Sequence, residues 1–318
     1  MKFELTILGT SAAVPTHNRY LSGQVLNVQD DLYLIDCGEG TQFRLTECHI
    51  KRTKINQIFI SHLHGDHFFG LFGLLTSLAM SGRTEPMDIF SPEGLEEIVA
   101  VMFKNSLYQS PFPIRFQAIR FEEGYEGPSL PIFENAKLTV SAFPLWHRIP
   151  TVGYVFKEKK ALRHILADQI TAFHIPYDKI NDIKKGADFN LKDSLLPELA
   201  NSNQVIPNVL LTEDSPAPRS FAYCSDTRYH EAILPHIGGV DVLYHEATFA
   251  HEMAAHAHMT GHSTALQAAM MAQKASVKKL IIGHFSSRYD NLDVLLDEAM
   301  HAYGNTVLAI DGHTYPVE

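Results

Sequence analysis

The segment Ser61-His62-Leu63-His64-Gly65-Asp66-His67 constrains this chain more than any other part of its sequence. It follows the isoleucine-rich run at 55–60, which predicts a buried strand, and it precedes an apolar helix predicted over 68–80. Three imidazoles and a carboxylate therefore lie within six residues between a strand and a helix. The motif predicts a metal-ligand cluster on the rim of a sheet, and the alternative is a loop of solvated or hydrogen-bonded histidines.

The spacing within the motif suits two ions. Alternate side chains of an extended segment point the same way, so His62 and His64 can bind one ion. Gly65 then lets the chain turn, and Asp66 and His67 at the start of the helix can face a second ion nearby.

The composition is that of an ordinary globular protein. Its 318 residues are 45% hydrophobic and 19% charged, enough for one large domain or two small ones. A net charge of −10 argues against a generally basic nucleic-acid coat, although it leaves room for a local positive patch.

The cysteines and the N-terminal segment bear on location. Cys37, Cys48 and Cys224 are too few and too irregularly spaced for a disulfide framework or a cysteine-based zinc site, so we expect structural thiols and a reducing compartment. The first nine residues do not form a signal sequence, and no long apolar stretch follows. We expect a cytoplasmic protein without a membrane segment.

Hydrophobic periodicity predicts strands alternating with helices. The predicted strands cover 3–8, 24–28, 32–35, 55–60, 87–90, 137–143, 220–224, 241–244, 279–282 and 306–310. The predicted helices, besides 68–80, cover 43–47, 94–103 and 265–274. Strand after strand ends close to a His or an Asp, at His62, His147, Asp226 and His284. This repetition is a stronger signal than any single residue, because a lone His is usually a core residue and a strand-terminal Asp can merely cap a turn.

These residues supply two sets of ligands. The first set is His62, His64 and His147; the second is Asp66, His67 and His284; Asp226 can bridge the two. Imidazole and carboxylate ligands without thiolate suit Zn²⁺ or, less well, Mn²⁺ or Fe²⁺. Two such ions roughly 3.5–4 Å apart can hold a hydroxide and clamp the attacking and leaving oxygens of a displacement at phosphorus. The residues alone therefore predict a two-metal hydrolase, with a phosphate ester as the favoured substrate.

Other polar residues are candidates for supporting roles. Asp36, at a strand end, can orient a ligating His or cap its own turn. Thr10 and Ser11 belong to a Gly/Ser/Thr loop that either contacts a phosphate or forms a plain turn. His262 stands just before the helix predicted over 265–274, where the helix dipole lowers imidazole basicity and faces anionic groups.

The segment 157–215 interrupts the strand–helix rhythm. It carries lysines among acidic and helix-breaking residues and predicts an inserted excursion with a short helix or two. Such a stretch is either a solvated face or a partner-binding arm.

The H-x-H-x-D-H motif together with His147, Asp226 and His284 resembles the metallo-β-lactamase superfamily. Within it, the chain is similar nearly end to end to the short-form ribonuclease Z family of tRNA 3′-end processing endonucleases. The similarity lies in Leu8-Gly9-Thr10-Ser11-Ala12, Val14-Pro15-Thr16, the segment 36–42, the segment 59–67, Gly153-Tyr154, His245-Glu246-Ala247-Thr248, His262-Ser263-Thr264-Ala265 and the segment 284–289. The combination of Glu246 in His-Glu-Ala-Thr with His262 in His-Ser-Thr is the most specific to this branch.

The resemblance implies an α/β fold of the α+β type, a four-layer αβ/βα sandwich of two mixed β-sheets flanked by helices. It implies cleavage of precursor tRNA after the discriminator nucleotide by metal-hydroxide attack, which leaves a 3′-hydroxyl. Asp66 would both bind metal and accept a proton from the water, and Glu246 with His262 would protonate the departing 3′-oxygen. Arg288 would contact a phosphate, or is simply a surface arginine. Two Zn²⁺ per subunit and a homodimer are also implied.

In this reading residues 1–318 form one metallo-β-lactamase-like domain, and the 157–215 excursion contains the arm that grips the tRNA elbow. The Gly-Pro doublet expected in the arm is missing, and Ile175-Pro176-Tyr177 stands in its neighbourhood, which puts elbow affinity in doubt more than chemistry. Three alternatives stay open: a two-metal phosphodiesterase acting on another RNA or on small phosphodiesters, a non-catalytic RNA-binding module, and a di-iron oxidoreductase. The last would need a carboxylate in place of His64.

Overall fold

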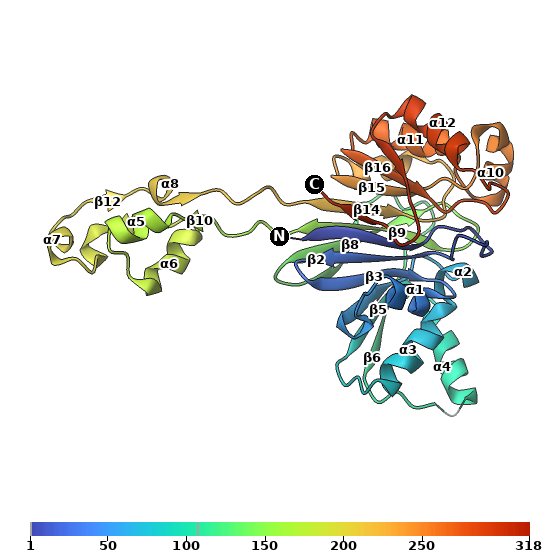
Figure 1. Cartoon of the computed structure of the whole chain (residues 1–318), viewed down its shortest axis with the longest axis horizontal. Helices are drawn as coiled ribbons and strands as arrows, with labels where there is room; N and C mark the ends of the chain where they lie inside the picture. Colours follow the sequence, from blue (N-terminus) through green and yellow to red (C-terminus); the bar gives the residue numbers. More distant parts are fainter. Residues whose placement is uncertain (1, 107) are drawn as a thin grey trace. The chain divides into compact units, whose positions relative to one another are not determined.

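A computed structural model describes residues 2–106 and 108–318. The chain separates into two compact units, of which unit 1 combines the residues before Glu158 with Arg219–Glu318 and unit 2 is Glu158–Pro218. Two seven-stranded sheets occupy the described part of unit 1 (Figure 1).

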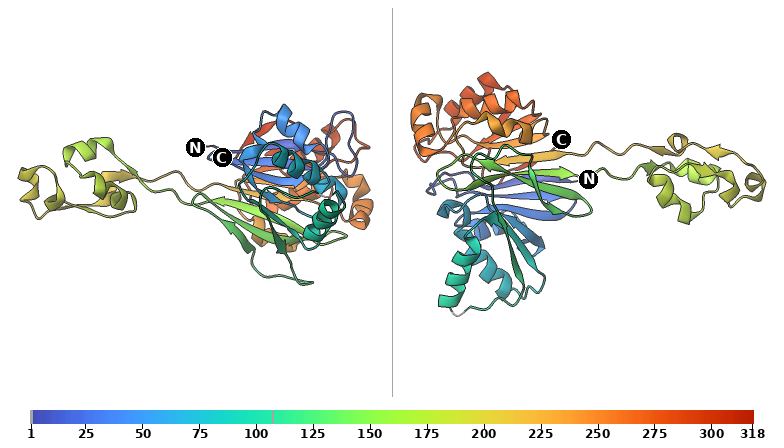
Figure 2. Two further views of the ribbon diagram at one scale, coloured as in Figure 1. Left: turned by 90° about the horizontal axis from the view of Figure 1, so that it is seen from below. Right: turned by 180° about the vertical axis from the view of Figure 1, so that it is seen from behind.

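The first sheet is antiparallel at one end and parallel at the other. Its strands, in spatial order, are β18 (Thr314–Pro316), β1 (Phe3–Gly9), β2 (Gly23–Val28), β3 (Asp31–Cys37), β4 (Ile55–Phe59), β5 (Met87–Pro92) and β6 (Ile114–Ile119). Neighbours from β18 to β3 are antiparallel, and those from β3 to β6 are parallel. Because β1 pairs with β18, the two ends of the chain lie close together (Figure 2).

The second sheet has the same mixed character. Its strands, in spatial order, are β17 (Thr306–Leu308), β16 (Lys279–Gly283), β15 (Val242–Glu246), β14 (Ser220–Cys224), β9 (Thr151–Glu158), β8 (Leu138–Leu145) and β7 (Leu130–Glu134). Strands β14 to β17 are parallel, so their C-terminal ends meet at one edge. Strand β9 is antiparallel to β14, and β7 is antiparallel to β8.

Alternation along the strands places the core between the two sheets. In β3, Tyr33 and Ile35 pack into a cluster that draws on both sheets, whereas Leu34 faces the outer cluster. The central cluster is rich in aromatic rings, and burying each Phe stabilises the fold by roughly 1.5–3 kcal/mol. Phe59 and Phe90, for example, stack with centroids 4.8 Å apart.

Helices cover the outer faces of both sheets (Figure 1). Those against the first sheet are α1 (Thr41–Glu47), α3 (Gly70–Met80) and α4 (Leu95–Asn105), and those against the second are α11 (Ala265–Lys274) and α12 (Asp293–Ala302). The order helix, sheet, sheet, helix confirms the predicted four-layer α/β class. The shorter helices of unit 1 are η1 (Arg52–Lys54), α2 (Gly65–Phe68), η3 (Glu231–Ile233), α9 (Leu234–Ile237), η4 (His251–Met253) and α10 (Ala254–Thr260). Among the helices of residues 2–106 and 108–318, none has the length and apolarity to cross a membrane.

Unit 2 has its own small core and a slight net negative charge. Its elements are β10 (His164–Ile165), α5 (Ala167–Ala172), α6 (Tyr177–Lys184), β11 (Phe189–Asn190), η2 (Leu191–Asp193), α7 (Pro197–Ala200), β12 (Val205–Ile206), α8 (Asn208–Leu211) and β13 (Thr212–Glu213). Ile175, Ile183, Phe189 and Leu211 belong to its apolar cluster. Seven Lys and Arg stand against nine Asp and Glu, so the unit carries a net charge of −2.

The structure corrects several predicted boundaries. The helix predicted over 68–80 is divided between α2, which ends at Phe68, and α3, which begins at Gly70. Gly70 packs closely on Gly38, since a Cβ on Gly70 would lie 2.0 Å from the Gly38 oxygen. Strand β15 continues through Glu246. The periodicity missed β9 and the edge strands β6, β7 and β18, since an edge strand that buries few of its residues leaves a weak pattern.

Candidate metal centre

The predicted ligands come from loops at the ends of the strands. His62 and His64 follow β4, and His147 follows β8. Asp226 follows β14, and His284 follows β16. Strands β14 and β16 run parallel and end at a common edge, which brings Asp226 and His284 together. His62 and His64 from the first sheet and His147 lie within contact distance of Asp226 at the same rim.

Four side chains, those of His62, His64, His147 and Asp226, form a first group of possible metal ligands. The Nε2 atom of His62 lies 3.0 Å from Nδ1 of His64, which lies 3.2 Å from Nε2 of His147. The Oδ2 atom of Asp226 lies 3.6 Å from Nε2 of His62 and 3.7 Å from Nε2 of His147. The four atoms could bind a single cation.

A second group shares Asp226 with the first. The Nε2 atom of His67 lies 3.4 Å from Oδ2 of Asp66 and 3.4 Å from Oδ1 of Asp226. The Nε2 atom of His284 lies 3.7 Å and 3.1 Å from the same two oxygens. Asp226 therefore presents one carboxylate oxygen to each group, which is the arrangement of a bridging ligand.

Two observations indicate that divalent cations fit these groups. Ligand atoms in a tetrahedron around Zn²⁺ are about 3.3–3.6 Å apart, close to the separations above. In addition, Nε2 of His67 and of His284 are buried without a hydrogen-bond partner, a costly condition that a bound cation would relieve.

The charge around His67 points the same way. Burial alone would lower the pKa of its imidazole, but the carboxylates of Asp226, Asp36 and Asp66 outweigh burial and hold the pKa well above its ordinary value. A buried site with this much negative charge requires a positive charge, which a proton or a metal ion supplies.

The opposite ring nitrogens of the histidines are held by a second layer of contacts. Nδ1 of His62 contacts the Ser61 hydroxyl at 3.0 Å. Nδ1 of His147 donates to the Gly261 carbonyl at 2.7 Å, and Nδ1 of His284 contacts the Thr248 hydroxyl at 3.0 Å. When Nδ1 carries the proton, Nε2 has none and its lone pair can bind a cation.

Asp36 holds His67 in the same way. Its Oδ2 accepts from Nδ1 of His67 at 2.7 Å and from the Tyr223 and Ser61 hydroxyls at 2.7 and 2.9 Å. Its Oδ1 accepts from the Ser61 backbone N–H at 2.7 Å. Asp36 is fully buried with a left-handed backbone (φ 53°), and the four hydrogen bonds hold this unfavourable conformation in place.

The buried Glu246 and the half-buried His262 form a pair at the margin of the second group. Glu246 Oε1 accepts from Nδ1 of His262 at 2.9 Å and from the backbone N–H groups of Thr227 and Ser263 at 3.0 Å each. Its Oε2 accepts from Thr248. Burial would raise the pKa of Glu246, but His262 outweighs it and lowers this pKa.

The predicted effect of the helix dipole on His262 is wrong in direction. Burial lowers the pKa of the imidazole, but the Glu246 carboxylate outweighs it and raises the pKa to about 9. The helix α11 begins three residues later, at Ala265, and the Thr264 hydroxyl caps its N-terminal end. The nearby carboxylate therefore decides the basicity of His262.

A cavity of about 620 Å³ opens over both groups. Its wall includes His64, Asp66, His147, Asp226, His262 and His284. Thr10 and Ser11 are buried, with their hydroxyls bonded to Asp311 and to the Val14 carbonyl. The adjoining residues 12–15 form part of the cavity wall, so the two hydroxyls have structural partners, and contact of this loop with substrate stays a prediction.

Arginines lie around this cavity. Arg288 is exposed outside its wall and stacks over Phe249, with 5.0 Å from its guanidinium carbon to the ring centroid; its phosphate contact stays a prediction. Arg148, which the motif analysis missed, belongs to the wall. Ser61 and Thr248 were also missed as supports, although both lie inside motifs that the sequence displays.

Known proteins resemble this chain over its whole length. Ribonuclease Z of Bacteroides thetaiotaomicron is 44% identical over 308 residues, covering 97% of this chain and 93% of the relative. Ribonuclease Z of Bacteroides fragilis is 42% identical over 308 residues, covering 97% of each. The family model described as anti-Pycsar protein Apyc1 matches residues 3–126.

Solved structures share the fold. The short form of human tRNase Z superposes with a TM-score of 0.71 at 25% identity, covering 99% of both chains. The metallo-β-lactamase fold protein YhfI of Bacillus subtilis has a TM-score of 0.67 at 16% identity, again with 99% coverage of both. Fold and site together define a metal-dependent hydrolase of the metallo-β-lactamase fold. With the sequence identities above, the chain belongs to the ribonuclease Z family.

Proposed function

We propose that this protein is an endoribonuclease that removes the 3′ trailer from precursor tRNA after the discriminator nucleotide and leaves a 3′-hydroxyl. The observation that carries the proposal is the Glu246–His262 pair, which lies beside a carboxylate that joins two groups of metal ligands. Membership of the ribonuclease Z family supports the substrate.

The cations would be held by His62, His64, His147 and Asp226 on one side and by Asp66, His67, His284 and Asp226 on the other. When bound, divalent cations acidify water and neutralise charge on a phosphodiester. The nitrogen and oxygen ligands favour two Zn²⁺ per subunit, with Mn²⁺ or Fe²⁺ as substitutes. Elemental analysis of the purified protein tests the metal and its count.

Asp66 would receive the proton of the attacking water. Its Oδ2 accepts from the Ala13 backbone N–H at 2.9 Å and faces His67 and His284, so the carboxylate is oriented from both sides. Water forms the new bond to phosphorus and gives up a proton, while the bond between phosphorus and the 3′-oxygen breaks.

His262 supplies the proton that the departing 3′-oxygen needs. The imidazole borders the cavity, and the Glu246 carboxylate at 2.9 Å stabilises its protonated form. Glu246 is itself held by hydrogen bonds from Thr227, Ser263 and Thr248, so it cannot turn away from His262.

The partners follow from the same assignment. We propose that unit 2 binds precursor tRNA away from the cut; its net charge of −2 means that shape and local contacts would contribute more than overall charge. Exposed apolar side chains on α3 and α4, among them Met80, Val101 and Met102, support association into a homodimer. Three unpaired cysteines support a cytoplasmic location.

The experiment that tests the proposal is mapping of the cut on a labelled precursor tRNA with zinc-loaded protein. We expect one cut after the discriminator with a 3′-hydroxyl on the tRNA. Turnover of a small phosphodiester without this cut would favour the phosphodiesterase alternative. Tight RNA binding with no turnover of either substrate would favour a binding module, and redox-active iron would revive the oxidoreductase.

A further inference from the structure

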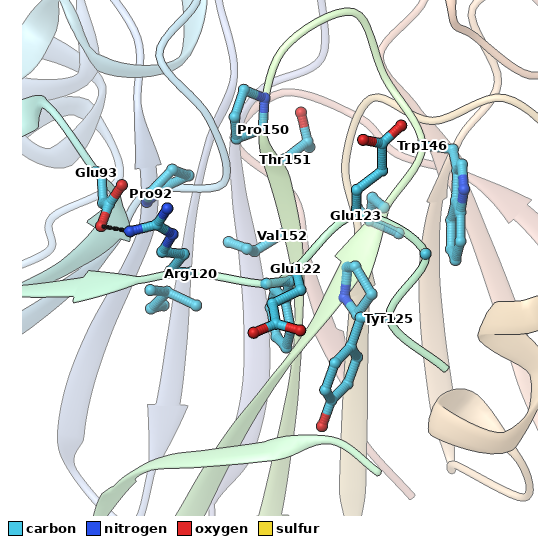
Figure 3. A pocket seen from close by; sticks show the side chains of 15 residues that line it. Pro92, Glu93, Arg120, Glu122, Glu123, Tyr125, Trp146, Pro150, Thr151 and Val152 are labelled. Carbon is cyan, nitrogen blue, oxygen red and sulfur yellow. Dashed lines mark ion pairs between the residues drawn. The ribbon is translucent and has the colours of Figure 1, made fainter. Parts of the chain in front are cut away.

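A second cavity, of about 470 Å³, lies apart from the wall of the metal centre within unit 1 (Figure 3). Pro92, Glu93 and Arg120 form one side of it, and Trp146 stands on the opposite side. Pro92 is the last residue of β5 and Glu93 follows it, while Arg120 follows β6 and Trp146 follows β8, so the cavity lies at the strand ends.

The walls of this cavity and of the metal centre are connected by one covalent link and one backbone hydrogen bond. Trp146 lines the cavity, and the next residue, His147, lines the metal centre. Val152, also in the cavity wall, donates its backbone N–H to the Ser61 carbonyl at 2.9 Å, directly before His62. A polynucleotide bound across the metal centre could therefore place a neighbouring nucleotide here.

The wall combines aromatic surface with hydrogen-bond acceptors. Phe121, Tyr125 and Trp146 contribute the rings. The Trp146 indole is held in place by a stack on His230, with centroids 3.8 Å apart and planes 9° apart, and Phe121 packs on Tyr125 at 5.0 Å. Such surfaces bind unstacked nucleobases, which present a flat apolar face.

The charge of the wall selects among ligands. Glu93, Glu122 and Glu123 stand against one arginine, Arg120, which forms an ion pair with Glu93 at 3.5 Å. A phosphate would be repelled here, whereas a base that presents an amino group can donate to Glu122 or Glu123 (Figure 3). Cytosine, adenine and guanine carry such a group, and uracil does not.

We propose that this cavity binds an unpaired nucleobase with an exocyclic amino group, close to the cut in the single-stranded 3′ region of the substrate. The inference rests on the proposed function. It assigns Glu122 and Glu123 to the recognition of substrate, outside the metal centre, and predicts that the enzyme discriminates against uridine at one position near the cut.

The test compares two pairs of adjacent exposed glutamates. The variant E122A/E123A removes the acceptors of the cavity, and E96A/E97A makes the same change of charge on α4, outside its wall. We expect kcat/KM for precursor tRNA to fall about tenfold in E122A/E123A, the size of a lost hydrogen bond to a charged group. We expect E96A/E97A to match the wild type or to exceed it slightly, because removing negative charge favours RNA. Equal behaviour of the two variants would overturn the proposal.

Substrates with uridine in place of another nucleotide, at one position around the cut at a time, supply the second arm. The wild type should lose about tenfold at one position, and E122A/E123A should show no such loss there. A flat scan, or a loss that persists in the variant, overturns the proposal while the cut after the discriminator still supports the proposed function. A wild type that does not make this cut removes the proposed function and this inference together.

Discussion

Replacement of Asp36 by Asn separates its two possible roles, since the carboxylate either orients a ligating histidine or only holds its own turn. Asp36 Oδ2 accepts from Nδ1 of His67 at 2.7 Å. An amide has one acceptor oxygen, and if this stays with the Ser61 N–H at the Oδ1 position, the NH₂ group faces His67. His67 can then accept a hydrogen bond at Nδ1 only if its proton moves to Nε2. Nε2 is the atom that would bind the second cation, and a protonated Nε2 cannot do so.

The expected cost follows from these contacts. Loss of such a supporting hydrogen bond weakens metal binding roughly 10–100-fold, or about 1.4–2.7 kcal/mol. Buried donors left without an acceptor lower the free energy of unfolding of the metal-free protein by about 1–3 kcal/mol. We therefore expect D36N to bind its second zinc 10–100-fold more weakly, with the first affected less.

Competition titration against a chromogenic zinc chelator measures the two affinities, and urea denaturation of the metal-free protein measures the stability. The control is D31N, on the same strand, where the carboxylate is 42% exposed and pairs with Lys137 at 3.0 Å. A D36N protein that is less stable but binds both zinc ions like the wild type would refute the orienting role and leave Asp36 a turn residue.

Four further predictions concern the centre and unit 2. H64A should lose several orders of magnitude in RNA turnover, because a ligand of the first group is gone; unchanged turnover would make the site vestigial. E246A and H262A should each cut turnover while zinc content stays at the wild-type value by elemental analysis, and loss of zinc would mean that these residues are ligands. Because Glu246 raises the pKa of His262 to about 9, His262 should stay protonated, and kcat/KM should stay high, up to about that pH. In E246Q the decrease of kcat/KM on the basic side should move toward the ordinary histidine pKa of 6.5. Deletion of 158–218 should raise KM for precursor tRNA and spare small phosphodiesters; equal damage to both would make unit 2 part of the fold.

Local patterns in the sequence were sufficient for most of the strands and for the location of the ligands, and the family resemblance carried by the motifs supplied the fold class. Two-residue alternation of apolar side chains marks a strand whatever the rest of the chain does, and it located most of the strands. The motif at 61–67 and the His or Asp residues that follow strand ends are equally local. Edge strands such as β6 were not predicted, because they bury few residues.

Only the tertiary structure decided which side chains lie next to one another in the metal centre. Asp226 lies between the two groups because β14 is packed beside β15 and β9, and nothing in its own segment encodes that position. The basicity of His262 was mispredicted because only the nearby helix is visible in the sequence. The Glu246 carboxylate is 16 residues away along the chain, and no local pattern shows that it lies 2.9 Å from Nδ1 of His262. The Thr10 hydroxyl donates to Asp311, 301 residues away along the chain, so its position is also set by the packing of distant segments. Spacing along the chain reports what a residue can bind, but electrostatic energy depends on distance in space, which the packed sheets set.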